Sequence, residues 1–136
     1  MIRAIRAHLF IGDQTEAEHP SPGITAILWA ARDPLKKPPP NILLARLPLT
    51  EYSEPDIIDL QAGVDWLTRH LPHHMVLVAC RAGMGRSTSV VLAYLCCVEN
   101  LSYKKALAYL VAKHPGTTPL PRLEGLIQTM KSQKPK

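Results

Sequence analysis

The sequence predicts one α/β domain, in which a central, mostly parallel sheet of four to five strands is flanked by helices. Two observations carry this prediction. The 136 residues are a usual length for one domain, and 46% of them are hydrophobic, which is enough for a single ordinary core. Short apolar runs also alternate with longer segments of helical periodicity, and most of the thirteen prolines fall between them.

The first half of the chain contains mainly short strands. Residues 2–11 carry alternating and short apolar runs that predict one or two strands, and Asp13 is placed to cap a short helix. Residues 24–30 and 42–47 are nearly continuous apolar runs, typical of strands buried on both faces. The segment 33–40 between them is rich in Pro and Lys and is interpreted as a loop.

The second half of the chain is mainly helical. A polar connection precedes residues 56–70, whose apolar positions have helical spacing, and residues 75–79 form another predicted strand. Three further helices are expected, of which the first is apolar nearly all round and therefore central and buried. Ser102 is the expected N-cap of the second. Their ranges are 86–100, 102–113 and 119–130.

The composition indicates a generic basic surface. The formal net charge is +5, which favours anionic partners such as phosphate esters. The Lys and Arg residues are spread along the chain, so no stable nucleic-acid partner is expected. The one local concentration, at Lys131, Lys134 and Lys136, belongs to a tail that we expect to be frayed from about residue 131.

Cysteine usage favours a cytoplasmic protein and histidine spacing indicates no metal site, and we further expect a monomer without a cofactor. The three cysteines are an odd number and contain no C-x-x-C pair, and we expect Cys96 and Cys97 to pack in the core. The six histidines show no metal-ligand spacing. Neither a secretory signal nor an apolar run long enough for a membrane span is expected.

The segment most informative for chemistry follows the predicted strand 75–79. Ligands bind at the carboxyl ends of the strands in parallel sheets. A cysteine leaves the strand there, five residues including two glycines follow, and an Arg-Ser pair then opens the buried helix. The segment reads Cys80-Arg81-Ala82-Gly83-Met84-Gly85-Arg86-Ser87-Thr88.

Each part of this segment favours the binding of an anion. Gly83 and Gly85 permit backbone angles that let successive amides turn inward and form a nest. The N-terminus of the following helix adds further N–H groups and a favourable dipole, which also stabilises a thiolate on Cys80. Arg86 offers a planar fork that binds two phosphate oxygens at once. The segment therefore predicts a phosphate cradle with a sulfur nucleophile beneath it.

The segment resembles the C-x5-R-[S/T] signature of the protein tyrosine phosphatase superfamily. LFIGD with GITAILWAA, and KALAYLVAKHPGTTPLPRLEGLIQ, are similar to the first strands and closing helices of its dual-specificity group. The resemblance covers nearly the whole chain and implies one phosphatase catalytic domain over residues 1–136. It makes Cys80 the nucleophile, Arg86 the phosphate clamp, and Ser87 the hydroxyl that helps the cysteine leave. The cradle amides would be those of Arg81, Ala82, Gly83, Met84, Gly85 and Arg86.

The sequence departs from the family pattern at two positions. Ala79 stands where the family usually has a His that holds the loop, so a weaker site is expected. The family's general acid is an Asp about 30 residues before the cysteine. Aligning Pro48 with the family's proline places Glu51 near that position. Asp56 and Glu54 are the alternatives, and a site without a side-chain acid also stays open.

The resemblance implies hydrolysis of phosphotyrosine, and of phosphoserine or phosphothreonine, through a phosphocysteine. Non-protein monoesters such as phosphoinositides, nucleic-acid 5′-phosphates or glycan phosphates are the alternative substrates. A non-catalytic phosphate-binding module is a second hypothesis, because the usual His and Asp are missing. A rhodanese-type sulfurtransferase is a third, although its cysteine loop is typically one residue shorter.

Overall fold

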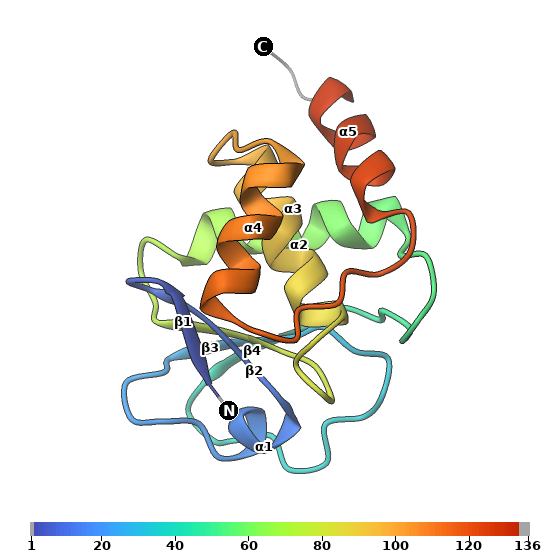
Figure 1. Ribbon diagram of the computed structural model, residues 1–136. Helices are drawn as coiled ribbons and strands as arrows, with labels where there is room; N and C mark the ends of the chain where they lie inside the picture. Colours follow the sequence, from blue (N-terminus) through green and yellow to red (C-terminus); the bar gives the residue numbers. More distant parts are fainter. Residues whose placement is uncertain (1, 134–136) are drawn as a thin grey trace.

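The computed structural model describes residues 2–133 and contains a five-stranded sheet covered by helices on both faces (Figure 1). The sheet order is β1-β2-β5-β3-β4, and every neighbouring pair is parallel except the antiparallel pair β1 and β2. The strands are β1 Arg3–Arg6, β2 Leu9–Gly12, β3 Ala26–Trp29, β4 Leu43–Arg46 and β5 Val76–Ala79. The helices are α1 Gln14–Glu18, α2 Ile57–His70, α3 Arg86–Cys97, α4 Tyr103–Lys113 and α5 Leu123–Gln133. The predicted fold class is thereby confirmed.

The buried strand β5 lies at the centre of the sheet, between β2 and β3. Side chains alternate between the two faces of a strand, and β5 follows this rule. Val76 and Val78 belong to the apolar cluster on the face covered by α2–α5, whereas Leu77 and Ala79 belong to the cluster on the face of α1. Both faces of the central strands are therefore packed, which explains their nearly continuous apolar sequence.

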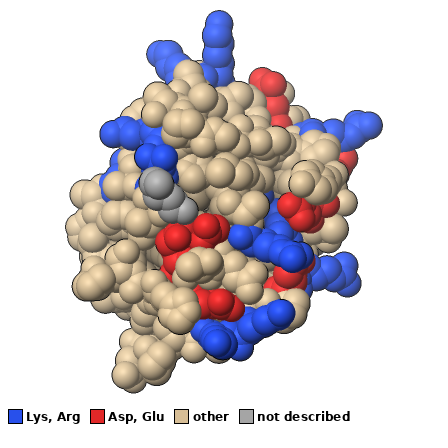
Figure 2. Space-filling model, turned by 60° about the horizontal axis from the view of Figure 1, so that its bottom comes forward, with Lys and Arg blue, Asp and Glu red and all other residues tan. Residues whose placement is uncertain are grey.

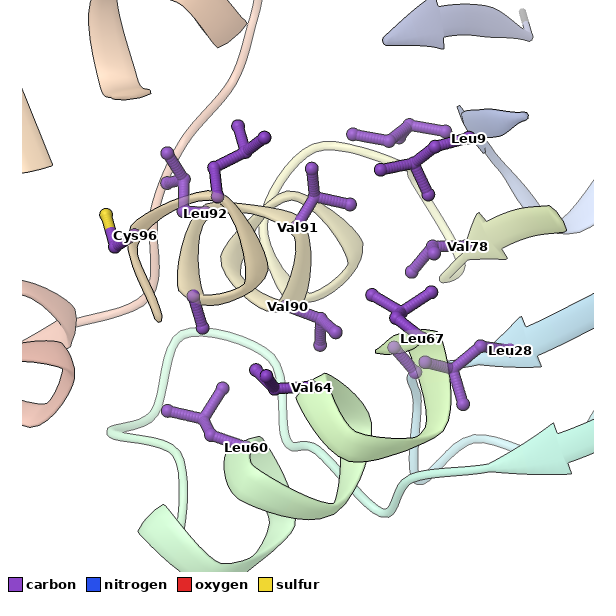
Figure 3. Close-up of a cluster of buried hydrophobic side chains, with 14 of the residues drawn as sticks. Leu9, Leu28, Leu60, Val64, Leu67, Val78, Val90, Val91, Leu92 and Cys96 are labelled. Carbon is purple, nitrogen blue, oxygen red and sulfur yellow. The ribbon is translucent and has the colours of Figure 1, made fainter. Parts of the chain in front are cut away.

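Helix α3 is the centre of the main core. Val90, Val91 and Leu92 are fully buried, and Figure 3 shows α3 with side chains of α2 and of the strands directed toward it. Even the first residues of the helix, Ser87 and Thr88, are completely buried. Because α3 is packed on all sides, the position and direction of its N-terminus are fixed relative to β5.

Several helix starts agree with the predicted caps. The side chain of Asp13 accepts a hydrogen bond from the backbone N–H of Glu16, and the side chain of Glu16 accepts one from the backbone N–H of Asp13. The two bonds form a capping box. Ser102 caps α4 in the same side-chain-to-backbone manner. Among residues 2–133, no helix is sufficiently long and apolar to cross a membrane.

Two predicted elements are wrong in detail. The strand within 42–47 is not buried on both faces, because β4 lies at the edge of the sheet and Leu43 is 41% exposed. The last helix does not begin at residue 119. Pro119 and Leu120 are irregular, Pro121 and Arg122 form a turn, and Arg122 has a left-handed backbone with a φ of 62°.

The end of the chain is helical further than expected. Helix α5 continues through Gln133, so Lys131 lies within the helix and not in a frayed tail. The rest of the predicted tail, including Lys134 and Lys136, lies outside the described residues.

Candidate active site

The segment from Cys80 to Gly85 joins the carboxyl end of β5 to the N-terminus of α3. Gly85 is the N-cap residue of α3 and provides no side-chain cap. The first N–H groups of a helix have no partner within the helix, so they are available to an anion. The sequence therefore folds into the strand-loop-helix arrangement that was predicted.

The backbone carbonyls of the loop point away from its centre. That of Arg81 accepts from the N–H of Gln14, that of Met84 from the N–H of Thr118, and that of Gly85 from Ser89. The carbonyl of Gly83 lies 2.7 Å from Nε2 of His114.

The amide N–H groups of the loop are left for a ligand. Among residues 2–133, no protein acceptor bonds the N–H groups of residues 81–86. Because the carbonyl and the N–H of one peptide plane point in opposite directions, the outward carbonyls turn the amides of Ala82, Met84, Gly85 and Arg86 inward. The loop is a preformed nest for an anion.

The two loop glycines serve different purposes. Gly83 has a φ of +74°, and a Cβ atom there would lie 2.8 Å from the carbonyl oxygen of Gly12. Gly83 is therefore required by both conformation and space. Gly85 has an ordinary φ of −111°, so the expectation of an unusual backbone angle is wrong there. Its lack of a side chain instead allows the carbonyl of Thr118 to approach closely, since a Cβ would lie 3.2 Å from that oxygen.

Cys80 lies at the floor of the nest. Its Sγ atom accepts a hydrogen bond from the backbone N–H of Ser87 at 3.4 Å and is 3.3 Å from Oγ of Ser87. The thiol is 2% exposed but lines a cavity of about 370 Å³. The geometry thus places the sulfur of Cys80 below the inward amides.

Arg86 is held by a carboxylate that the sequence analysis had assigned only to a loop. Its guanidinium donates to both carboxylate oxygens of Asp33 at 3.2 Å each and to the carbonyl of Leu49 at 3.3 Å. The Arg86 guanidinium lowers the pKa of Asp33 through these hydrogen bonds. Asp33 is itself positioned by Trp29, whose Nε1 donates to the Asp33 carbonyl at 2.7 Å. Within residues 2–133, Nε of Arg86 has no protein acceptor, so this edge of the fork can bind a phosphate.

The three acid candidates occupy different positions. Glu51 lines the cavity with Cys80, and its Oε2 is 4.0 Å from a terminal nitrogen of Arg86. The carboxylate of Asp56 accepts from the N–H of Ile58 at 2.7 Å and caps α2. The carboxylate of Glu54 pairs with Arg122 at 3.2 Å. Only Glu51 of the three lines the cavity.

The cavity has mainly apolar walls. Its lining above the sulfur consists of Tyr52, Ala82, Met84, Pro119, Leu120 and Pro121. A larger hollow of about 500 Å³ lies beside Asp65 of α2 and Met130 of α5, but its lining contains no Lys or Arg to hold an anion. The cavity above Cys80 is therefore the candidate active site.

Charge around the site is mixed. Figure 2 brings forward the lower side of Figure 1 and shows basic and acidic side chains interspersed on it. Arg81 is exposed, and its charge contributes to the lowered pKa of Asp33. No group of three or more His, Cys, Asp or Glu side chains within residues 2–133 is arranged to hold a metal ion. The anion site consists of backbone amides and one guanidinium.

Comparison with known families agrees with this geometry. The model of the dual-specificity phosphatase catalytic domain matches residues 14–132. The chain belongs to the dual-specificity phosphatase family. It is a cysteine-based phosphatase domain of that family, and a phosphorylated compound is its expected substrate class. A search of curated protein sequences finds no match.

Solved structures of this family share the fold. Human DUSP28 is 22% identical with a TM-score of 0.83, and the alignment covers 96% of this chain and 93% of that chain. Human tyrosine phosphatase-like serine/threonine/tyrosine-interacting protein is 21% identical with a TM-score of 0.83, covering 96% and 95%. A mouse putative dual specificity phosphatase complexed with zinc tungstate is 23% identical with a TM-score of 0.79, covering 96% and 86%. At these identities the likeness concerns the fold alone.

Sequence reasoning missed two residues that contact the cradle, Asp33 and His114. Asp33 follows a predicted strand, and the rule that ligand-site residues cluster after parallel strands is a signal that could have found it. His114 lies in the connection after α4, where the sequence carried no comparable signal. Both residues are far from the loop in sequence and reach it only through the packing of the domain.

Proposed function

We propose that this domain hydrolyses phosphotyrosine, and more slowly phosphoserine and phosphothreonine, through a phosphocysteine intermediate. The observation that carries the proposal is the combination of inward amides with the Cys80 sulfur below them and the Arg86 fork beside them. A phosphoryl group in this nest would have its phosphorus in front of the thiolate, which is the geometry that a displacement requires.

The first chemical step forms the phosphocysteine. The Cys80 thiolate attacks phosphorus, and the bond between phosphorus and the leaving oxygen breaks. Glu51, in its protonated form, donates its proton to that oxygen. Arg86 and the loop amides stabilise the charge on the three remaining phosphoryl oxygens.

The second step releases phosphate. Water attacks the phosphorus of the phosphocysteine, the Glu51 carboxylate takes a proton from that water, and the sulfur leaves as a thiolate. Ser87 assists this departure, since its hydroxyl lies 3.3 Å from the sulfur and can donate to the returning thiolate. Glu51 is protonated again and Cys80 is ionised again, so the cycle closes without a further reactant.

The preference for phosphotyrosine rests on the rim of the cavity. Tyr52 is 81% exposed although it lines the cavity, and its backbone is held at a φ of 62°. Residues held in a strained backbone conformation are concentrated at functional sites. A substrate ring between Tyr52 and the wall of Pro119 and Pro121 would bury apolar area that a phosphoserine does not possess.

The cytoplasmic location and the monomeric state are part of the same proposal. Cys80 and Cys96 are free thiols, as expected in a reducing compartment. The cradle amides, the thiol, the guanidinium and the carboxylates all come from one chain. A second copy is therefore not needed to complete the site.

A turnover assay tests the central claim. Hydrolysis of a generic aryl phosphate is measured for the native protein and for Cys80→Ser and Arg86→Lys. We expect turnover by the native protein, none by Cys80→Ser, and a strong loss with Arg86→Lys because Lys lacks the bidentate fork. Equal rates for the native protein and Cys80→Ser would overturn the phosphatase mechanism and favour a phosphate-binding module.

Matched phosphopeptides test the substrate. Three peptides that differ only in phosphotyrosine, phosphoserine or phosphothreonine are compared with a phosphoinositide, a 5′-phosphorylated oligonucleotide and a phosphorylated glycan. The proposal requires the phosphotyrosine peptide to have the highest kcat/KM. We expect Tyr52→Ala to reduce its advantage over phosphoserine by about 3- to 10-fold, the value of one aromatic contact. A higher kcat/KM for a non-protein monoester would overturn the peptide assignment.

A further inference from the structure

His114 is a buried polar residue that contacts the cradle from the helical side. It is the C-cap residue of α4 and is 3% exposed. Its Nε2 atom lies 2.7 Å from the carbonyl oxygen of Gly83, whereas its Nδ1 atom has no hydrogen-bond partner among the described residues. It is the one buried side chain of residues 2–133 with such an unpartnered nitrogen or oxygen.

The contact to Gly83 fixes the form of the imidazole. A carbonyl oxygen can only accept, so the hydrogen must be on Nε2 and Nε2 must be the donor. Nδ1 is then a buried polar atom without a partner, which is unfavourable. This arrangement is consistent with a residue whose main contribution is the single bond to the loop.

That bond controls one peptide group of the cradle. The carbonyl of Gly83 and the N–H of Met84 belong to the same plane and point in opposite directions. When His114 holds the carbonyl outward, the Met84 N–H must point into the nest. Gly83, with its positive φ, is the loop residue at which such a peptide could rotate most easily.

On the other side of the loop, the N–H of Gln14 donates to the Arg81 carbonyl at 3.2 Å, and no side-chain donor among residues 2–133 bonds a loop carbonyl there. Ala79, which precedes Cys80, packs in the cluster on the α1 face together with Trp29. The α4–α5 connection instead holds the loop at successive points. The N–H of Thr118 donates to the Met84 carbonyl at 2.8 Å, and the N–H of Leu120 donates to Ser89 Oγ at 2.9 Å.

We propose that His114 is a positioning residue for catalysis, which keeps the Gly83–Met84 peptide oriented so that its amide faces the phosphate and the thiolate. This inference rests on the proposed function. Without the His114 donor, the peptide would rotate part of the time and present a carbonyl oxygen to the anion. Phosphate binding and thiolate stabilisation would then weaken together.

Two substitutions separate the donor from the bulk of the side chain. His114→Gln retains a donor at the distance of Nε2, and His114→Leu fills the space without a donor. We expect His114→Leu to lower kcat/KM for an aryl phosphate about tenfold, the effect of one hydrogen bond. The inhibition constant of inorganic phosphate should rise, and alkylation of Cys80 by iodoacetate should reach half its maximal rate at higher pH. His114→Gln should lie close to the native protein in kcat/KM, in the phosphate inhibition constant and in the pH midpoint of alkylation.

A matched control detects a merely structural role. Leu110 is fully buried in the same helix and does not line the cavity, so Leu110→Ala destabilises α4 without removing a loop contact. At an equal loss in Tm, Leu110→Ala should leave the phosphate inhibition constant and the alkylation midpoint unchanged. The proposal is overturned when His114→Leu matches the native protein in both readouts, or when Leu110→Ala reproduces its losses.

The test remains decisive in two further cases. Should His114→Leu not fold, His114→Gln is compared with His114→Asn, whose shorter amide cannot reach the Gly83 carbonyl. Equal phosphate affinities of His114→Gln and His114→Asn would contradict the proposal, and a higher phosphate affinity of His114→Gln would support it. Should the native protein hydrolyse no monoester, the proposed function fails by itself, since phosphate binding by calorimetry and Cys80 alkylation still measure the effect of His114 on the cradle.

Discussion

Replacing Asp33 by Asn tests whether the bidentate pair with Arg86 orients the phosphate clamp. The native carboxylate accepts from both terminal nitrogens of the guanidinium at 3.2 Å. Asn has nearly the same shape but one oxygen only, and its NH2 group would face an N–H of Arg86. One of the two hydrogen bonds is therefore lost, while the bond from Arg86 to the Leu49 carbonyl at 3.3 Å remains.

Two opposite effects determine the kinetics of Asp33→Asn: the loss of a hydrogen bond to Arg86 and the loss of a negative charge near the phosphate. Hydrogen bonds to a charged group contribute about 1.5–3 kcal/mol when buried, and the Asp33 side chain is 35% exposed, so about 1–1.5 kcal/mol is expected for the lost bond. Removal of the carboxylate also relieves its repulsion of a phosphate dianion on the far edge of Arg86, which in water-like surroundings is about 1 kcal/mol. The repulsion is similar in the bound substrate and in the transition state, so it affects KM and cancels from kcat.

The lost bond loosens the orientation of Arg86, and its energy is the upper limit of what this costs the transition state, so we expect Asp33→Asn to lower kcat by up to about tenfold and to leave KM unchanged or decreased. Steady-state kinetics with an aryl phosphate at low ionic strength measures both parameters. Asp65→Asn removes the same charge from α2, far from the cavity lining, and serves as the matched control. A kcat for Asp33→Asn within twofold of the control would refute the positioning role of Asp33.

The same pair has a consequence for stability against acid. The pKa of Asp33 is lowered in the folded protein because it accepts hydrogen bonds from Arg86. Its stabilising contribution is therefore present above the ordinary Asp pKa of about 3.9 and is lost as the pH falls through the lowered value. Urea unfolding should give a higher free energy of unfolding for the native protein than for Asp33→Asn at pH 7, and this difference should shrink toward pH 3. A difference in unfolding free energy that grows at low pH would contradict the expected loss of the Asp33 contribution.

Three other predictions concern the acid, the loop and the core. Glu51→Gln should lower kcat by about 10²- to 10⁴-fold for a poor leaving group, whereas Asp56→Asn should leave kcat unchanged. Gly83→Ala should remove phosphate binding and destabilise the fold by about 1–3 kcal/mol in urea unfolding, since an added Cβ meets backbone. Burial raises the pKa of Cys96 to about 11, so mass spectrometry after iodoacetate treatment at pH 7 should find Cys80 modified and Cys96 not. Retained phosphate binding by Gly83→Ala would contradict the prediction for the loop. Modification of Cys96 at a rate equal to that of Cys80 would contradict the prediction for the core.

The sequence by itself determined the local chemistry of the site. The segment from Cys80 to Ser87 contains the proposed nucleophile, the guanidinium and the permissive glycine within one strand-loop-helix unit. Such a unit is decided by short-range preferences: an apolar strand, a Gly that accepts positive φ, and an apolar helix. Caps such as Asp13 and Ser102 are local for the same reason, since the side chain and the amide that it bonds are three residues apart.

Only the tertiary structure decided which distant groups complete the cradle. Asp33 and Arg86 are 53 positions apart in the sequence, and His114 and Gly83 are 31 positions apart. Hydropathy also could not distinguish the central β3 from the edge strand β4, because an apolar run shows that a strand can be buried, not which neighbours it will have. Long-range contacts depend on the packing of whole elements, and that packing fixes the clamp, the outward carbonyls and hence the inward amides.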